Sequence, residues 1–371
     1  MVSVGAIERQ TMVFDEPLEL SSGIKLPHWQ LSYETYGVAN SQMSNAVLVC
    51  HALSGSQHAA GWYVDNPKDV GWWDNFIGPG KPLDTDRFFV ISSNNLGGCH
   101  GSTGPLSPHP DDGEPYGGRF PVVTVEDWVH SQKRLAERLG INRFAAVVGG
   151  SLGGMQALRW AMDYPDCLQA AVIIAAAAKL TALNIGFNDV ARQAIMSDPD
   201  FCEGNYYACE KQPQGGLRLA RMLAHLTYLS DAHMAARFGR ERREAETAYN
   251  YDIEFQVESY LRYQGSKFSD CFDANTYLLM TRALDYFDPA ASRDNNLTHA
   301  LAPITAKLLL LSFSSDWRFS PKCSEEITQA LLQAKKRVSY IEIESQEGHD
   351  SFLLENSDYH RAVSAFMTTL A

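Results

Sequence analysis

A serine lies between an apolar run and a helical pattern in the middle of the chain. Residues 144–150 are apolar without polar alternation, which predicts a strand buried on both faces. Residues 152–162 place apolar groups at helical spacing without proline, which predicts a helix. The junction reads Gly149-x-Ser151-x-Gly153, in which glycines permit a sharp strand-to-helix turn. The pattern predicts a nucleophilic Ser151 rather than an inert serine in a glycine-rich turn.

A serine hydroxyl needs a neighbouring base, and that base needs an acid to orient it. Chains with this kind of turn carry the three residues in the order serine, acid, histidine. Asp316 follows the apolar run 307–313, and His349 follows the predicted strand 338–343. Both therefore lie at the carboxyl ends of strands, where Ser151 also projects. The three residues predict acyl transfer through an acyl-serine. They leave open whether water or another nucleophile accepts the acyl group, and spacing alone makes an esterase the default.

The apolar run 46–50 predicts a central strand that leads directly into His51-Ala52-Leu53-Ser54-Gly55. The loop after this strand is expected to donate one backbone N–H to an oxyanion hole. We expect the Leu53 amide to be that donor and the Leu152 amide to be the second. His51 precedes a turn of small residues, so we expect it to shape the loop rather than to act as the base.

The remaining patterns predict strands at 87–92, 168–178, 307–313 and 338–343, and an exposed edge strand at 31–36. Helices are predicted at 124–139, with Thr124 as the N-cap, at 323–334 and at the end of the chain. Residues 180–300 show several helical patterns and no convincing strand. We therefore expect a core of residues 1–180 and 301–371 with a helical lid insertion at 181–300, whose apolar faces could also serve a dimer interface.

The formal net charge of −13, without a run of Lys and Arg, argues against nucleic acid and anionic membrane surfaces as partners. No stretch approaches the roughly 20 apolar residues of a membrane helix, and residues 1–10 show no secretory signal pattern. The seven cysteines lack paired C-x-x-C spacing, which predicts reduced thiols in a cytoplasmic enzyme. We expect neither a metal nor a cofactor.

Five segments together resemble the homoserine O-acyltransferases of the α/β-hydrolase superfamily, over nearly the whole chain. They are residues 33–37 (YETYG), 51–55 (HALSG), 95–105 (NLGGCHGSTGP), 149–156 (GGSLGGMQ) and 348–352 (GHDSF). The resemblance implies a mostly parallel central sheet with helices on both faces and a helical lid. It also implies a ping-pong reaction of methionine biosynthesis, in which Ser151 takes an acyl group from acyl-CoA and passes it to L-homoserine. Acyl-CoA is then a substrate rather than a cofactor.

By the same resemblance, Arg221 binds the carboxylate of homoserine and Asp350 binds its ammonium group. A guanidinium fork suits a carboxylate, and Asp350 adjoins His349. Two alternatives remain at this point: Arg221 is a solvated helix arginine, and Asp350 only orients the His349 loop.

The acyl donor depends on Arg318, two residues after the predicted acid. A succinyl group carries a distal carboxylate that an acetyl group lacks, and a buried carboxylate needs a cationic partner. In acetyltransferase-like members of the family this position is typically apolar, so Arg318 favours succinyl-CoA. Acetyl-CoA as the donor is the second hypothesis, a lidded serine esterase is the alternative of a different class, and a homodimer through the lid helices is expected.

Overall fold

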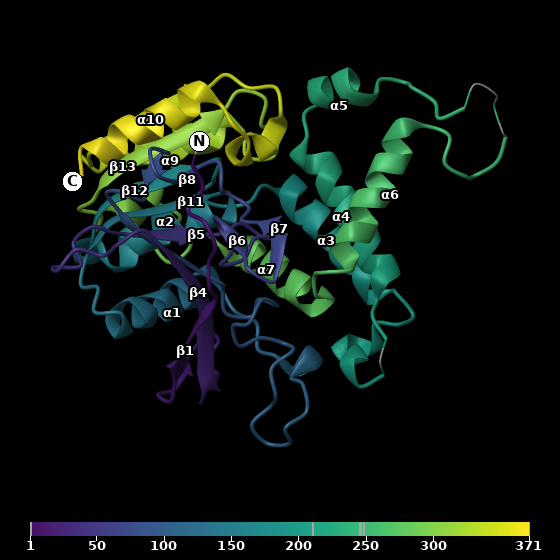
Figure 1. Ribbon diagram of the computed structural model, residues 1–371, viewed down its shortest axis with the longest axis horizontal. Helices are drawn as coiled ribbons and strands as arrows, with labels where there is room; N and C mark the ends of the chain where they lie inside the picture. Colours follow the sequence, from purple (N-terminus) through teal and green to yellow (C-terminus); the bar gives the residue numbers. More distant parts are fainter. Residues whose placement is uncertain (1, 210, 245–246, 248, 371) are drawn as a thin grey trace.

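The computed structural model describes residues 2–209, 211–244, 247 and 249–370. An eight-stranded sheet runs through the molecule in the order β1-β4-β10-β5-β11-β12-β13-β14 (Figure 1). The six strands from β10 to β14 in this order are parallel, and β4 pairs antiparallel with both β1 and β10. The strands span Gln10–Phe14 (β1), Trp29–Tyr36 (β4), Phe89–Ser93 (β10), Ala46–Cys50 (β5), Phe144–Gly150 (β11), Leu168–Ile174 (β12), Lys307–Phe313 (β13) and Val338–Ile343 (β14).

The two faces of the sheet belong to two separate apolar clusters, because side chains alternate along each strand. On one face the sheet packs against α1 (Val125–Arg138), α2 (Leu152–Asp163) and α9 (Pro321–Gln333). On the other face it packs against α10 (Ser357–Thr368) and the aromatic residues of the segment 73–83. The mostly parallel sheet with helices on both faces, expected from the sequence, is therefore confirmed (Figure 1).

Helix α1 shows why the sequence signals at its start were informative. Thr124 accepts a hydrogen bond from the Asp127 amide, and the Asp127 carboxylate accepts one from the Thr124 amide in return. This capping box satisfies two amides that have no acceptor within the helix. The predicted N-cap is confirmed, and the predicted strands and helices of the core occur within a few residues of their expected limits.

The expectation that residues 31–36 form an exposed edge strand is wrong. Strand β4 lies between β1 and β10, and its side chains are mostly buried. The edge of the sheet on this side is β1, where no strand was predicted from the sequence. The polar residues of β4 suggested a solvated face, yet Ser32 and Glu34 point inwards and are fully buried. Buried polar side chains of this kind need partners from other segments, which a local pattern does not reveal.

In the described part of the chain that connects β12 to β13 there are six α-helices. Within the described residues this segment contains no strand and one isolated bridge, between Arg242 and Phe255. The helices are α3 (Ala182–Met196), α4 (Gln214–Tyr228), α5 (Asp231–Phe238), α6 (Gln256–Ser269), α7 (Ala274–Tyr286) and α8 (Leu297–Leu301). Four of them, α3 to α6, lie beside the sheet core in Figure 1. Helix α4 packs between α3 and α6. The role of residues 181–300 as a lid stays a prediction. In the part of the chain that is described, no helix combines the length and apolar character that a membrane crossing requires.

Candidate active site

The turn between β11 and α2 holds Ser151 in a backbone conformation that side-chain-bearing residues rarely adopt, with φ 57° and ψ −123°. Two of the flanking glycines are required by neighbouring backbone. A Cβ on Gly149 would lie 2.2 Å from the carbonyl carbon of Gly153, and a Cβ on Gly153 would lie 2.0 Å from the carbonyl oxygen of Cys50. The glycine pattern seen in the sequence therefore reflects tight packing of the turn against β5.

The structure brings Ser151, His349 and Asp316 into one hydrogen-bonded chain. The Nε2 atom of His349 lies 2.8 Å from Ser151 Oγ, and its Nδ1 atom lies 2.7 Å from Asp316 Oδ2. All three side chains are buried, with 9%, 3% and 2% exposure for Ser151, His349 and Asp316. With Nδ1–H donating to the carboxylate, Nε2 is left as the acceptor that a serine proton needs.

Asp316 is oriented by the loop that follows β13. Its Oδ1 atom accepts hydrogen bonds from the backbone amides of Arg318 at 3.0 Å and Phe319 at 2.9 Å. The ring centres of Phe319 and Phe352 lie 4.9 Å and 5.5 Å from the centre of the His349 ring and shield it from solvent. With both of its oxygens hydrogen-bonded, the Asp316 carboxyl group is held in place and in turn fixes the orientation of the His349 ring.

The two candidate oxyanion donors belong to the loop after β5 and to the start of α2, next to Ser151. The Leu152 amide is in the first turn of α2, where N–H groups have no acceptor within the helix. Leu53 lines the same cavity as Ser151 and belongs to the loop after β5. Both positions match the expectation from the sequence, and their role as donors stays a prediction.

His51 is tied to the backbone and stands apart from the triad. Its Nε2 atom accepts a hydrogen bond from the Asn95 amide at 3.0 Å, so its Nδ1–H donates to the Ala52 carbonyl at 2.7 Å. Burial lowers the pKa of His51 to about 4, which keeps the ring neutral in this arrangement. These bonds hold the entry to the loop of residues 51–55, as expected from the sequence.

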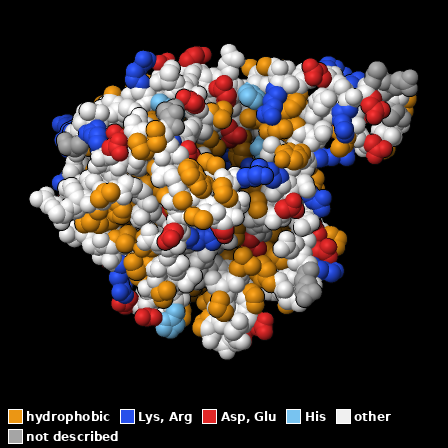
Figure 2. All heavy atoms as spheres, viewed as in Figure 1, with side chains coloured by type: hydrophobic (Ala, Val, Ile, Leu, Met, Phe, Trp, Pro, Cys, Tyr) orange, Lys and Arg blue, Asp and Glu red, His pale blue; other side chains and the backbone are white. Residues whose placement is uncertain are grey.

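A cavity opens above the triad, between the sheet core and the helical insertion. Figure 2 shows the surface hollowed between these two parts of the molecule. The lining side chains come from the loop after β5, from the turn of Ser151, from α4 and α7, and from the loops around Asp316 and His349. They are Ala52, Leu53, Ser54, Ser151, Tyr228, Leu284, Arg318, Phe319, His349, Asp350, Phe352 and Leu353.

Arg221 projects from α4 towards the loop after β5. Its Nη1 atom lies 3.4 Å from Ser54 Oγ, and its guanidinium stacks 4.5 Å from the centre of the Phe268 ring. Its Nε–H is buried and has no acceptor among the described residues. Arg221 is therefore not simply a solvated helix arginine. In the part of the chain that the structure describes, its Nε–H is a free hydrogen-bond donor close to the cavity residue Ser54.

Asp350 lines the cavity directly after His349. Burial raises the pKa of its carboxyl, while the charge of Arg221 acts in the opposite direction. A carboxyl in this position gains stability as the anion when a cation binds beside it. Its location satisfies the geometric requirement for contacting an ammonium group, and its role stays a prediction.

Arg318 is buried, with 7% exposure, and lines the cavity beside Ser151. Its Nη1–H donates to Thr227 Oγ1 at 2.5 Å, and its Nη2–H donates to Asn188 Oδ1 at 3.3 Å. No carboxylate of the described residues lies within 4.0 Å of it, although a buried guanidinium normally has an acidic partner. Arg318 is therefore neither a loop arginine that faces solvent nor the partner of a surface acid.

Sequence reasoning missed the residues of the insertion that hold Arg318. Thr227 and Tyr228 end α4, and Asn188 lies in the middle of α3, where it also donates to Asp285. The Tyr228 ring lies 5.5 Å from the Arg318 guanidinium and 5.7 Å from that of Arg221. These residues belong to helices whose pattern signals only packing, so no signal in the sequence pointed to them.

Comparison with known proteins places the chain among relatives of one fold. Residues 45–355 match the model of the alpha/beta hydrolase fold family. Relatives named homoserine O-succinyltransferase occur in Burkholderia vietnamiensis, at 60% identity over 376 residues, and in Aromatoleum aromaticum, at 61% over 364 residues. The first alignment covers 100% of this chain and 99% of the relative, and the second covers 98% and 97%.

Solved structures of the same fold superpose closely. A homoserine O-acetyltransferase from Bacillus anthracis has a TM-score of 0.91 at 28% identity, covering 98% of both chains. The structure of esterase E22 has a TM-score of 0.89 at 31% identity, covering 97% of this chain and 100% of its own. Together with the full-length relatives, these matches show that the chain belongs to the homoserine O-acyltransferase family of the α/β-hydrolase fold.

Proposed function

We propose that the protein transfers the succinyl group of succinyl-CoA to the γ-hydroxyl of L-homoserine in methionine biosynthesis. Arg318 carries this proposal, because it is a buried cation without an acidic partner in the described residues, beside Ser151. The distal carboxylate of a succinyl group would supply the missing charge. The full-length relatives named homoserine O-succinyltransferase support the same reaction.

In the first half of the reaction, Ser151 Oγ attacks the thioester carbonyl while His349 Nε2 takes its proton. The oxyanion accepts hydrogen bonds from the Leu53 and Leu152 amides. The carbon–sulfur bond breaks, the proton on His349 passes to the CoA sulfur, and a succinyl-Ser151 ester remains.

In the second half, the γ-hydroxyl of homoserine gives its proton to His349 and attacks the ester carbonyl. The tetrahedral intermediate collapses, and Ser151 regains the proton from His349. Arg221 holds the carboxylate of homoserine and Asp350 its ammonium group. Arg221 contacts Ser54 of the cavity lining and Asp350 lines the same cavity, so they would fix the acceptor at its α-carbon and leave the hydroxyl free to reach the acyl carbon.

The test compares the release of CoA from succinyl-CoA and from acetyl-CoA, each with and without L-homoserine. Fast release from succinyl-CoA that needs homoserine, with formation of O-succinylhomoserine, is the expected result. Equal release with and without the amino acid would instead establish an esterase, the alternative of a different class, which the superposition with esterase E22 favours. Preference for acetyl-CoA in the presence of homoserine would refute the choice of donor.

We propose further that two copies associate through the insertion and that the enzyme works in the cytoplasm. Side chains of α3 and α4 leave apolar surface exposed, namely Leu183, Val190, Leu219 and Leu226. The seven cysteines are all free, as expected in a reducing compartment. Sedimentation analysis should give twice the chain mass, and Leu219→Glu should give the monomer. A native protein that sediments as a monomer would refute the dimer.

A further inference from the structure

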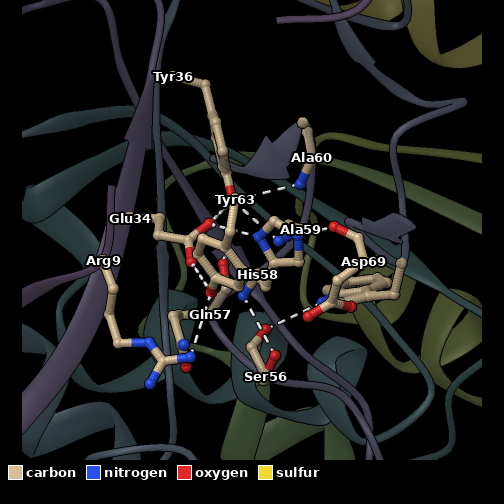
Figure 3. A network of polar contacts seen from close by, with 12 residues as sticks. Arg9, Glu34, Tyr36, Ser56, Gln57, His58, Ala59, Ala60, Tyr63 and Asp69 are labelled. Atoms are coloured by element: carbon tan, nitrogen blue, oxygen red, sulfur yellow. Dashed lines mark hydrogen bonds and ion pairs between the residues drawn. The ribbon is translucent and has the colours of Figure 1, made fainter. Parts of the chain in front are cut away.

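A buried carboxylate on β4 has no role in the reaction described above. Glu34 is fully buried and accepts three hydrogen bonds, from Tyr36 Oη at 2.8 Å, Tyr63 Oη at 2.5 Å and His58 Nδ1 at 3.0 Å (Figure 3). Removing a carboxylate from water costs desolvation free energy, and hydrogen-bond donors to its oxygens are needed to offset this cost. Three donors from different segments therefore converge on one side chain.

His58 must carry a positive charge to make both of its hydrogen bonds. Nδ1 faces the Glu34 carboxylate, and Nε2 lies 2.9 Å from the Asp69 carbonyl oxygen in β7 (Asn66–Val70). Both partners are acceptors, whereas a neutral imidazole has only one N–H. Burial alone lowers the pKa of His58, but the bonds to Glu34 and Asp69 outweigh it and raise the pKa above the usual 6.5.

The same network fixes the end of the loop that follows β5. Tyr36 Oη accepts hydrogen bonds from the amides of Ala59 at 2.8 Å and Ala60 at 3.2 Å, and lies 3.0 Å from the Gln57 carbonyl. Figure 3 shows Glu34 between Tyr36, Tyr63 and the ring of His58. Residues 57–60 are thus held by β4 at several backbone atoms.

The loop of residues 51–60 is consequently fixed at both ends. His51 holds its entry through the Asn95 amide and the Ala52 carbonyl, and Glu34 holds its exit. Leu53 lies between these two anchors and lines the cavity next to Ser151. A donor to an oxyanion has to be in place before the charge develops, because a donor that must move first stabilises the charge less.

We propose that Glu34 is a positioning residue for acyl transfer: through His58 and Tyr36 it fixes the loop of residues 51–60, and with it the Leu53 amide. The inference rests on the proposed function only in assigning this amide to the oxyanion hole. The hydrogen bonds of Glu34 go to Tyr36, His58 and Tyr63, none of which lines the cavity, so it acts on the reaction only through the position of the loop.

The test uses Glu34→Gln with 4-nitrophenyl acetate, whose burst of nitrophenol reports acylation of Ser151 without any amino acid. We expect kcat to fall about 10- to 100-fold, since a misplaced donor costs the transition state more than the bound substrate. KM should change less than about 3-fold. Glu8→Gln, which alters an exposed carboxylate on the N-terminal segment, serves as the matched control.

Tyr63→Phe is a second, milder variant in case Glu34→Gln does not fold. It removes only one hydrogen bond to Glu34, from a partly exposed side chain. It should fold and should lower kcat in the same direction by a smaller factor. Unchanged kcat in both variants, or a loss confined to KM, would overturn the proposal. If native protein cleaves the ester but does not transfer acyl groups from CoA to homoserine, the proposed function fails while the role of Glu34 is still decided.

The pH profile of the ester reaction separates His58 from the triad. His349 acts as the base because its Nε2 atom accepts the proton of Ser151. His58 acts as a cation, so kcat should fall as pH rises through its raised pKa, because one of its two hydrogen bonds is lost. Three residues face His58: Glu34 of β4, Tyr63 of β6 (Trp62–Tyr63) and Asp69 of β7. The centres of the His58 and Tyr63 rings lie 4.2 Å apart, and Arg9 donates to the Tyr63 hydroxyl.

Its tyrosine neighbour does not titrate in the same range, because burial raises the pKa of Tyr63 to about 12. The alkaline decline should therefore disappear in His58→Gln, which is neutral at every pH and should have a uniformly low kcat. A decline that persists in this variant at the same pH would refute the assignment to His58.

Discussion

Replacing Arg318 by methionine should change the choice of acyl donor. Methionine keeps most of the aliphatic volume and removes the guanidinium that faces the cavity. Only the succinyl donor brings a carboxylate to this position. We therefore expect a loss of kcat/KM that is large for succinyl-CoA and small for acetyl-CoA.

The size of the loss follows from the surroundings of Arg318. Unit charges about 4 Å apart attract by about 4 kcal/mol at an effective dielectric constant of about 20. Desolvation of the carboxylate offsets part of this attraction, and a hydrogen bond to a charged group has a net value of about 1.5–3 kcal/mol. Because Arg318 has no acidic partner among the described residues, the bound carboxylate does not compete with an existing ion pair. The expected loss for succinyl-CoA is roughly 10- to 150-fold.

The assay measures kcat/KM for both donors at saturating L-homoserine, by thiol release. The variant also leaves Thr227 and Asn188 without their donor, which we expect to lower stability by about 1–3 kcal/mol. This effect is common to both donors and cancels in their ratio. Arg318→Lys, which keeps the charge without the fork, should lie between wild type and methionine. Equal losses for both donors would refute the reasoning.

Three further changes test other parts of the site. Ser151→Ala should abolish the mass shift of an acyl-enzyme, and a persisting shift would reject the nucleophile. Arg221→Met should raise KM for homoserine about 10- to 100-fold with ester cleavage intact, since one charged contact is lost; Arg218→Met, exposed on the same helix, is the control. Gly153→Ala should lower the free energy of unfolding by about 3 kcal/mol, because its Cβ would meet the Cys50 carbonyl. Gly186→Ala, in open space on α3, should instead raise it by about 0.5–1 kcal/mol, and similar effects of both changes would contradict the packing argument.

The core of the fold could be predicted because its signals are local. The continuous apolar runs of β5, β11 and β13 indicate strands buried on both faces, and Thr124 with Asp127 marks the start of α1. The prediction of an exposed edge strand at residues 31–36 was wrong because the partners of its polar side chains are not local in the sequence. The inward polar groups of β4 are satisfied by donors such as His58, 24 residues further along the chain, and local alternation carries no information about such partners.

The candidate site divides in the same way. Ser151, Asp316 and His349 follow strand ends in the order that the fold requires, so their meeting was predictable from the sequence. The residues that hold Arg318 were not predictable, because Thr227 and Asn188 lie on α4 and α3, 91 and 130 positions away from Arg318 in the chain, and no local pattern indicates such a contact.

By itself, the sequence determined the parallel sheet, the strained serine turn and the order of the triad, since each depends on neighbours within a few residues or on the edge to which parallel strands lead. Only the tertiary structure decided that Arg318 is buried without an acid among the described residues and that Glu34 points inwards to clamp the loop of Leu53. These facts depend on contacts across 24 to 130 positions of the chain, where partner and distance are set by how the insertion and the sheet pack together.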